Sequence, residues 1–151
     1  NPHIEEIEPE LTFEQPGCIP EQYLPDVGQR LQYYKRLASA PEEEMVQSIA
    51  GELQDRFGVL PKETEYLISG MVLKALARKL AIRGIEVFAK WLTFHLAFDS
   101  KVQPARIVEI IREEKGYVQL TEDLKIKVRL KPQNEHPLDT AIHFLHRLGG
   151  V

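Results

Sequence analysis

The sequence has a single cysteine, Cys18, and no long apolar run. One cysteine cannot form a disulfide within the chain, which is typical of proteins kept in a reducing cytoplasm. No stretch approaches the roughly 20 apolar residues that span a bilayer, so the sequence offers no transmembrane helix. The first three residues, Asn-Pro-His, and the acidic residues after them lack the basic and apolar regions of a signal peptide. We therefore expect a cytoplasmic protein with no membrane partner.

Motifs that carry enzyme chemistry are also missing. There is no glycine-rich phosphate loop, no G-x-S-x-G nucleophile motif and no H-E-x-x-H zinc motif. Cys18 has no neighbouring base, so we expect a small buried residue rather than a nucleophile. His143 and His146 are spaced i, i+3 with His136 nearby, but H-x-x-H recurs by chance and no cysteine accompanies it. The sequence predicts no catalytic residue, no cofactor and no metal in this chain.

Basic residues are absent from the first 29 positions, which hold seven carboxylates. Residues 30–151 contain the other 16 of the 23 acidic residues and all 19 basic residues. They therefore carry a net charge of +3 in a chain whose total is −4. An acidic leader before a mildly basic body suggests a solvated tether, or a segment that lies on a basic surface. A dedicated DNA-binding domain would show a higher pI and a clustered basic face, so DNA contact is not expected.

The length of 151 residues, 43% of them hydrophobic, fits a single compact domain. Residues 1–10 are predicted to be a linker and residues 11–13 a short strand. Asp26 is a good N-cap for a helix over residues 27–38. The apolar residues of this helix recur at intervals of three and four, which predicts a buried stripe of Val27, Leu31, Tyr34 and Leu37.

Two more helices follow before the pattern changes. The second begins at Pro41, a favourable first residue, and ends at Gly58, a favourable C-cap. Its apolar face repeats every four residues and contains Met45, Ile49, Leu53 and Phe57. The third helix runs from Pro61 to about Ile82.

After Gly84 the apolar period becomes that of strands. Residues 85–89 and 92–98 alternate on opposite parities, which predicts a hairpin or bulge near residues 89–91, shielded by Trp91. The remaining elements are a helix from Pro104 to Lys115, strands at 117–120 and 124–130, and a last helix at 137–148. Helices first and antiparallel strands later predict an α+β fold, with an N-terminal three-helix segment followed by antiparallel strands and two further helices.

Four basic residues alternate with apolar ones on the last predicted strand and therefore share one face: Lys125, Lys127, Arg129 and Lys131. This candidate basic strip could contact phosphates or an acidic partner segment. The alternative is an edge strand whose charges block edge-to-edge aggregation, and the sequence alone favours it. No aromatic residue alternates with these bases, so stacking of unpaired bases is poorly supported.

Glu52 and Asp55 are spaced i, i+3 on an outer flank of the second helix, which puts two carboxylates about one turn apart. Each could receive a guanidinium from a partner. The alternative is a solvated helix face with an internal ion pair to Arg56, and the residues alone favour it. A catalytic role is not supported, because no third polar group or pocket is indicated.

Three motifs occur in order near the N-terminus: I-P-x-x-Y-x-P-D at 19–26, R-L-x-x-Y-K-R-L-A-S-A at 30–40 and E-L-x-D-R-F-G-x-L-P at 52–61. Their joint spacing resembles the C-terminal domain of bacterial transcription-repair coupling factor, an ATP-dependent DNA translocase that removes stalled RNA polymerase from damaged DNA. The resemblance runs from about residue 11 to the end and is strongest up to about residue 84.

The resemblance implies that residues 11–151 are a non-catalytic regulatory domain. In this family the domain packs on an adaptor module of the same polypeptide and hides the surface that recruits the excision-repair protein UvrA, until stalled RNA polymerase is engaged. The positions that match Glu52 and Asp55 face arginines of that module, so the resemblance favours a partner contact over a solvated face. The competing hypothesis is an accessory domain that contacts nucleic acid beside the motor through its basic residues.

Overall fold

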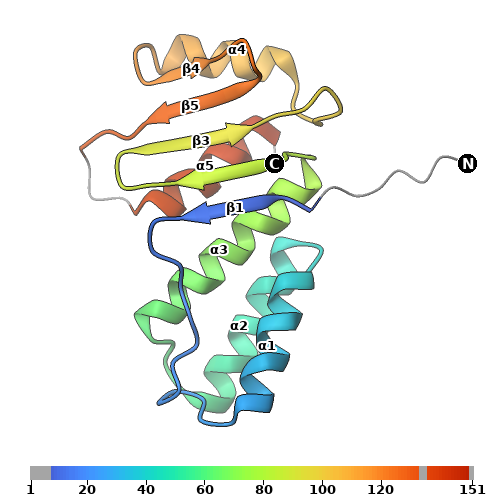
Figure 1. The fold of residues 1–151 in the computed structure, drawn as a ribbon, viewed down its shortest axis with the longest axis vertical. Coiled ribbons are helices and arrows are strands. Elements are labelled where there is room, and N and C mark those ends of the chain that lie inside the picture. The colour runs from blue at the N-terminus through green and yellow to red at the C-terminus, as the bar shows by residue number, and fades with distance from the viewer. Residues whose placement is uncertain (1–7, 133–135, 150–151) are drawn as a thin grey trace, which may run out of the picture. The chain divides into compact units, whose positions relative to one another are not determined.

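The computed structural model describes residues 8–132 and 136–149. Their contacts group into two compact units: a helical unit, Gln15–Leu76, and a sheet unit formed by Asn1–Glu14 together with Ala77–Val151. The described residues form five helices and one five-stranded sheet (Figure 1). The α+β class predicted from the sequence is therefore confirmed.

The helical unit contains α1 (Val27–Ser39), α2 (Glu43–Phe57) and most of α3 (Lys62–Lys79). Asp26 caps α1 as predicted, because its carboxylate accepts a hydrogen bond of 2.9 Å from the backbone N–H of Gln29. α2 ends at Gly58, whose φ of 94° lies in the region that favours glycine, and whose N–H donates to the carbonyl of Gln54. Both helix ends could be predicted from the sequence, because Asp26 and Gly58 each bond to a group within about one helical turn.

The buried face of α1 differs from the predicted stripe. Leu37 is buried as expected, but Val27 and Leu31 are 69% and 52% exposed, and Tyr33 is buried in their place. Tyr33 faces inward because its ring packs edge-on against Phe57 of α2 at 6.2 Å. Leu37 was therefore predicted correctly and Tyr34 is half-buried, but apolar spacing alone gave the wrong positions in the first half of the helix.

The buried face of α2 follows only the middle of the predicted row. Ile49 and Leu53 are buried, together with Val46 and Ala50 beside them, but Met45 is exposed and Phe57 is only half-buried. At 3.6 residues per turn, each step of four residues drifts by about 40° around the helix axis. A row of four such residues therefore turns through about 120°, and its two ends leave the buried face.

The extended segment before α1 is fastened to α3 through its backbone. The N–H of Cys18 donates to the carbonyl of Glu63 at 3.1 Å, and the buried hydroxyl of Thr64 donates to the carbonyl of Cys18 at 3.0 Å. Gly17 lies against the α3 backbone so closely that a Cβ atom would be 2.2 Å from the nitrogen of Leu67. The Cys18 side chain is exposed, so the expectation that it is buried is wrong, because the backbone rather than the thiol makes the contacts.

The sheet unit contains β1 (Glu10–Phe13), β2 (Gly84–Val87), β3 (Trp91–His95), β4 (Val118–Leu120) and β5 (Lys125–Arg129), in the order β1-β2-β3-β5-β4. β2 and β3 form the predicted hairpin. β1 pairs with β2 in parallel, so the sheet is mixed. Pairing between strands far apart in the chain leaves no local signal, which is why this parallel pair was not predicted.

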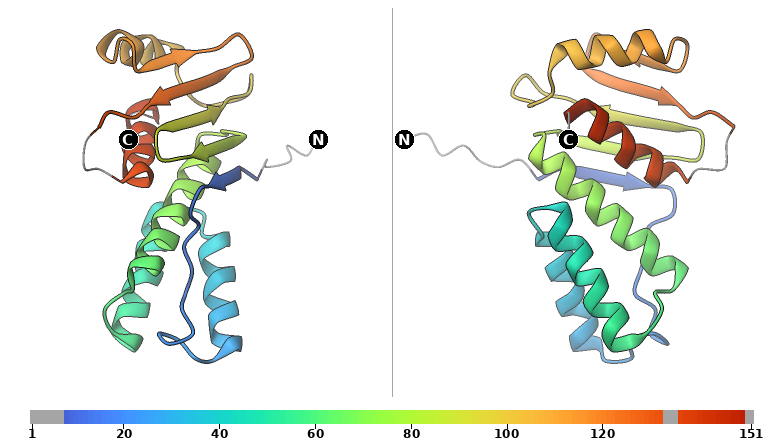
Figure 2. Two further views of the ribbon diagram at one scale, coloured as in Figure 1. Left: turned by 60° about the vertical axis from the view of Figure 1, so that its left-hand side comes forward. Right: turned by 180° about the vertical axis from the view of Figure 1, so that it is seen from behind.

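One face of the sheet carries the core of this unit. α5 (Pro137–Gly149) lies over that face (Figures 1 and 2), and Phe94 stacks on Phe144 of α5 at 4.9 Å. α4 (Pro104–Glu113) contacts β4 and α5. No described helix of the sheet unit lies over the opposite face, which we call the open face. No helix in the described ranges has the length and apolarity to cross a bilayer.

Candidate partner-binding site

An aromatic–arginine cluster joins α1 to the C-terminal half of α2. It consists of Tyr23, Tyr33, Phe57, Arg36 and Arg56. Arg56 donates to the Tyr33 hydroxyl at 2.7 Å and lies 4.9 Å from the centre of the Phe57 ring, while Arg36 lies 5.2 Å from the Tyr33 ring. Burial raises the pKa of Tyr33, so its phenol stays protonated and can also serve as a donor.

Tyr23 fixes the end of α2 from the other side. Its hydroxyl donates to the carbonyls of Leu53 and Gly58 at 3.0 and 2.7 Å. Its ring meets Phe57 edge-on at 6.0 Å. Because both tyrosines hold the last turn of α2, Asp55 on this turn has a defined position before any partner arrives.

Glu52 faces α1 and forms a bidentate contact with Arg36, with N···O distances of 2.5 and 3.3 Å. The hydrogen bond from Arg36, followed by one from Tyr33, lowers the pKa of Glu52 to about 2. The side chain is 40% exposed. The internal partner expected from sequence was Arg56; the structure instead shows Arg36, which is 16 residues away and comes close only because the two helices pack together.

Asp55 differs from Glu52 in its surroundings. It is exposed, and within residues 8–132 and 136–149 its carboxylate has neither an ion pair nor a side-chain hydrogen bond. The two carboxylates are thus neighbours on one helix with different states: Glu52 is already neutralised by Arg36, whereas Asp55 is available to a cation from outside.

The candidate basic strip occupies β5, where Ile126 and Val128 are buried between the bases as predicted. β5 is not an edge strand, however, because it pairs with β3 on one side and β4 on the other. The edge-protection explanation for its charges is therefore wrong. Strand order could not be inferred from the sequence, because β4 precedes β5 in the chain yet lies outside it in the sheet.

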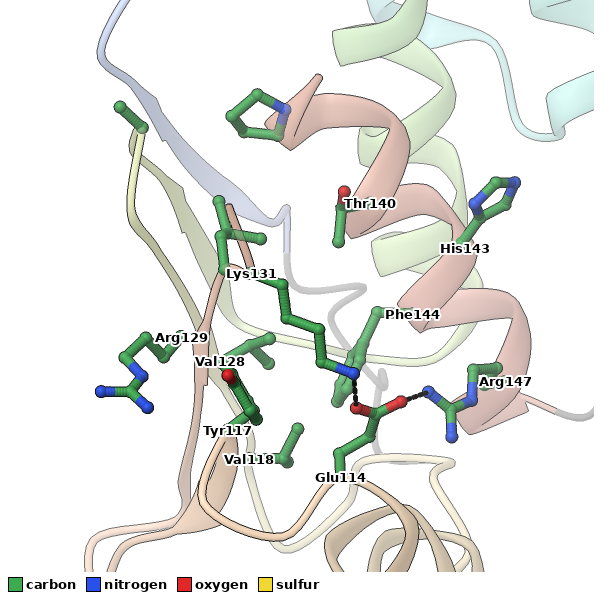
Figure 3. Close-up of a pocket in the computed structure, with 13 residues that line it drawn as sticks. Glu114, Tyr117, Val118, Val128, Arg129, Lys131, Thr140, His143, Phe144 and Arg147 are labelled. Atoms are coloured by element: carbon green, nitrogen blue, oxygen red, sulfur yellow. Dashed lines mark hydrogen bonds and ion pairs between the residues drawn. The ribbon is translucent and has the colours of Figure 1, made fainter. Parts of the chain in front are cut away.

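Lys131 departs from the strip. It follows the end of β5 and reaches into a pocket of about 270 Å³ between the strand ends and α5 (Figure 3). There its ammonium bonds to Glu114 at 2.7 Å, and Arg147 of α5 reaches the same carboxylate at 3.3 Å. His143, a candidate considered for metal binding, also lines this pocket. No set of three metal-ligating side chains is found in the described part of the chain.

We predict that Glu114→Gln destabilises the sheet unit by about 1 kcal/mol at pH 7, because it weakens charge-assisted bonds at a mostly buried carboxylate. Lys131, then Arg147, lowers the pKa of Glu114 below 4.5. A lowered folded pKa stabilises the fold above the unfolded value and loses that stabilisation as pH falls through the folded value. Urea unfolding should therefore show a difference in unfolding free energy between the unchanged protein and Glu114→Gln at pH 7, and this difference should shrink towards pH 3.

The matched control is Glu109→Gln, which changes an exposed carboxylate on α4, the helix that ends just before Glu114, and Glu109 has no side-chain partner in the described residues. It should change stability by less than about 0.5 kcal/mol at either pH. If Glu114→Gln lowers the unfolding free energy by the same amount at pH 7 and pH 3, the side chain contributes through its shape and not through its charge.

Comparisons with known proteins identify the family of this chain. Residues 13–107 match the family model described as the TRCF domain. The transcription-repair-coupling factors of Myxococcus xanthus and Escherichia coli (strain K12) are 36% and 32% identical over 82% and 83% of this chain. Those matches take in 10% and 11% of the two relatives, so the chain spans about a tenth of their length.

A solved structure agrees with this assignment at the level of the fold. It is described as the crystal structure of the C-terminal domain of transcription-repair coupling factor. It superposes with a TM-score of 0.80 over 94% of this chain and 92% of that chain, at 17% sequence identity. From the family model and the two relatives together, the chain belongs to the transcription-repair-coupling factor family.

Proposed function

We propose that residues 11–151 act as a non-catalytic regulatory domain of a transcription-repair coupling factor, with residues 1–10 leading in from the motor region. The domain would pack on the adaptor module of the same full-length protein and mask its UvrA-binding surface. Engagement of stalled RNA polymerase would favour the open state, in which UvrA gains access.

Asp55 is the observation that carries this proposal. It is an exposed carboxylate on a firmly held helix turn, with no side-chain partner in the described residues, and it belongs to the family motif E-L-x-D-R-F-G. An arginine from the adaptor module could bind Asp55 without breaking an existing contact. An arginine that binds Glu52 would have to share that carboxylate with Arg36.

The test is reversal of both charges, Glu52→Arg with Asp55→Arg, in the full-length protein. Like charges would then face each other across the closed interface, so closure should weaken. We expect UvrA to bind without stalled polymerase, with at least a tenfold rise in affinity and a raised basal ATPase rate. A pull-down and a titration with purified UvrA measure the first effect.

Two further variants sharpen the experiment. Glu109→Arg with Glu122→Arg reverses two exposed carboxylates of the sheet unit and should leave UvrA masked. Arg36→Gln removes the internal partner of Glu52 and adds net negative charge beside Asp55, so it should strengthen closure. If the reversed protein still excludes UvrA, the carboxylates are not the contact and another face of the domain must carry it.

A further inference from the structure

The open face of the sheet carries side chains that the proposed function does not use. Its central positions lie on β3 and β5, where Trp91, Thr93 and His95 stand opposite Arg129, Lys127 and Lys125 in register. The intervening residues of both strands, such as Phe94 and Ile126, are fully buried on the other side. The side chains on the open face of β3 and β5 therefore lie in the middle of the sheet, positioned by the ladder beneath them.

Positive charge on the open face is only partly neutralised. Lys125 pairs with Asp123 at 3.4 Å. Within the described ranges, neither Lys127 nor Arg129 has an ion pair or a side-chain hydrogen bond. The guanidinium of Arg129 lies 4.9 Å from the centre of the Tyr117 ring. Carboxylates on this face stand towards the other edge, where Glu86 is paired with His95 at 2.8 Å. An anion approaching β5 would therefore meet two unneutralised cations.

Aromatic rings border these cations. Trp91, which was expected to shield the hairpin, is 46% exposed and stands directly opposite Arg129. Tyr117 lies on the other side of Arg129, since the N–H of Arg129 donates to the carbonyl of Tyr117 at 2.7 Å. Lysine and arginine side chains do alternate with aromatic rings here. They alternate across neighbouring strands rather than along one strand, so the sequence of β5 alone did not show it.

We propose that the open face binds single-stranded nucleic acid, with phosphates on Lys127 and Arg129 and a base stacked on Trp91. Cations beside exposed aromatic rings on a sheet are the combination that such ligands require. A duplex fits less well, because its bases are already stacked and no described helix of the sheet unit lies on this face to enter a groove. An acidic protein segment would match the cations but would leave Trp91 without a role.

Trp91 is the sole tryptophan of the chain, so its fluorescence reports directly on this surface. The probe is a 12-nucleotide oligothymidylate, titrated into the 151-residue chain, with anisotropy of a labelled copy as a second signal. We expect quenching of Trp91 and a rise in anisotropy with the same midpoint. With two phosphate contacts, on Lys127 and Arg129, the logarithm of affinity should fall against the logarithm of salt concentration with a slope of about −1.4.

Matched variants separate the two components of binding. Lys127→Gln with Arg129→Gln should weaken binding at least tenfold and flatten the salt slope. Lys101→Gln with Arg106→Gln removes the same charge from exposed positions elsewhere in the sheet unit and should change affinity less than twofold. Trp91→Leu should weaken binding about tenfold without changing the slope, whereas Trp91→Phe should restore most of the loss.

Three results would overturn the proposal. They are no binding at low salt, equal affinity for a duplex of the same length, and stronger quenching by polyglutamate than by the oligonucleotide, which would assign the face to an acidic protein. The inference is independent of Glu52 and Asp55. Their reversal should leave oligonucleotide affinity unchanged, so failure of one proposal does not imply failure of the other.

Discussion

Gly17→Ala is expected to destabilise the helical unit by about 3 kcal/mol, near the upper end for an overpacked site. The new Cβ atom would lie 2.2 Å from the nitrogen of Leu67 and 2.4 Å from the carbonyl oxygen of Glu63. Both are backbone atoms of α3, so no side-chain rotation relieves the clash. The segment must move away, which also weakens the bond from Thr64 to Cys18 and leaves a buried hydroxyl poorly satisfied.

Gly51→Ala is the matched control, and its effect should have the opposite sign. Gly51 lies in the middle of α2, with no atom within 4 Å of the position of a new Cβ. Alanine there should stabilise the helix by about 0.5–1 kcal/mol. Thermal unfolding followed by circular dichroism measures both, with a fall of about 10 °C or more expected for Gly17→Ala. Equal melting temperatures for the two variants would contradict the close approach of Gly17 to α3.

Phe94→Ala should destabilise the sheet unit by about 3–5 kcal/mol, the range for removal of a buried aromatic ring. Phe94 is fully buried on the central strand β3 and stacks on Phe144 at 4.9 Å. Its loss leaves a cavity between the sheet and α5 that rigid neighbours such as Leu92 and Ile126 cannot fill. Because Trp91 lies on the same strand, urea unfolding followed by tryptophan fluorescence reports on this unit directly.

Phe98→Ala provides the comparison for the same chemical change at a solvated position. Phe98 is 100% exposed, so the change in unfolding free energy should be below about 0.5 kcal/mol. The midpoint urea concentration should fall for Phe94→Ala with an unchanged slope. Similar midpoints for the two variants would show that the ring of Phe94 does not hold α5 to the sheet.

The sequence predicted those parts of the fold that depend on neighbours within about one turn. Asp26 and Gly58 marked helix ends because each bonds to a group three or four residues away. The hairpin of β2 and β3 was also predictable, because its two strands are joined by a short turn and the alternation of apolar residues changes at that turn. The buried side of α1 could not be predicted, because Tyr33 turns inward to meet Phe57, a residue 24 positions later.

The sequence predicted that Glu52 and Asp55 share one helix, but not which of them is neutralised. The i, i+3 spacing correctly identified two carboxylates on one helix. Whether they are neutralised depends on α1, since Arg36 reaches Glu52 and leaves Asp55 unpartnered in the described residues. Likewise, the alternation of basic and apolar residues on β5 was predicted correctly. The position of β5 between β3 and β4 depends on strand order, and it rules out the explanation that its charges protect a sheet edge.

The parallel pairing of β1 with β2 has a consequence for the order of folding. The sheet unit is discontinuous in the chain, since residues 14–83 separate Phe13 from Gly84, and the helical unit lies within that interval. At about 5–20 residues per second, a ribosome needs roughly 4–14 s to make the intervening stretch. β1 therefore emerges well before its partner exists, and the helical unit can form while β1 waits. Closing so long a loop makes the docking of β1 a late event in synthesis, and until it happens the outer edge of β2 is open to mispairing with other chains.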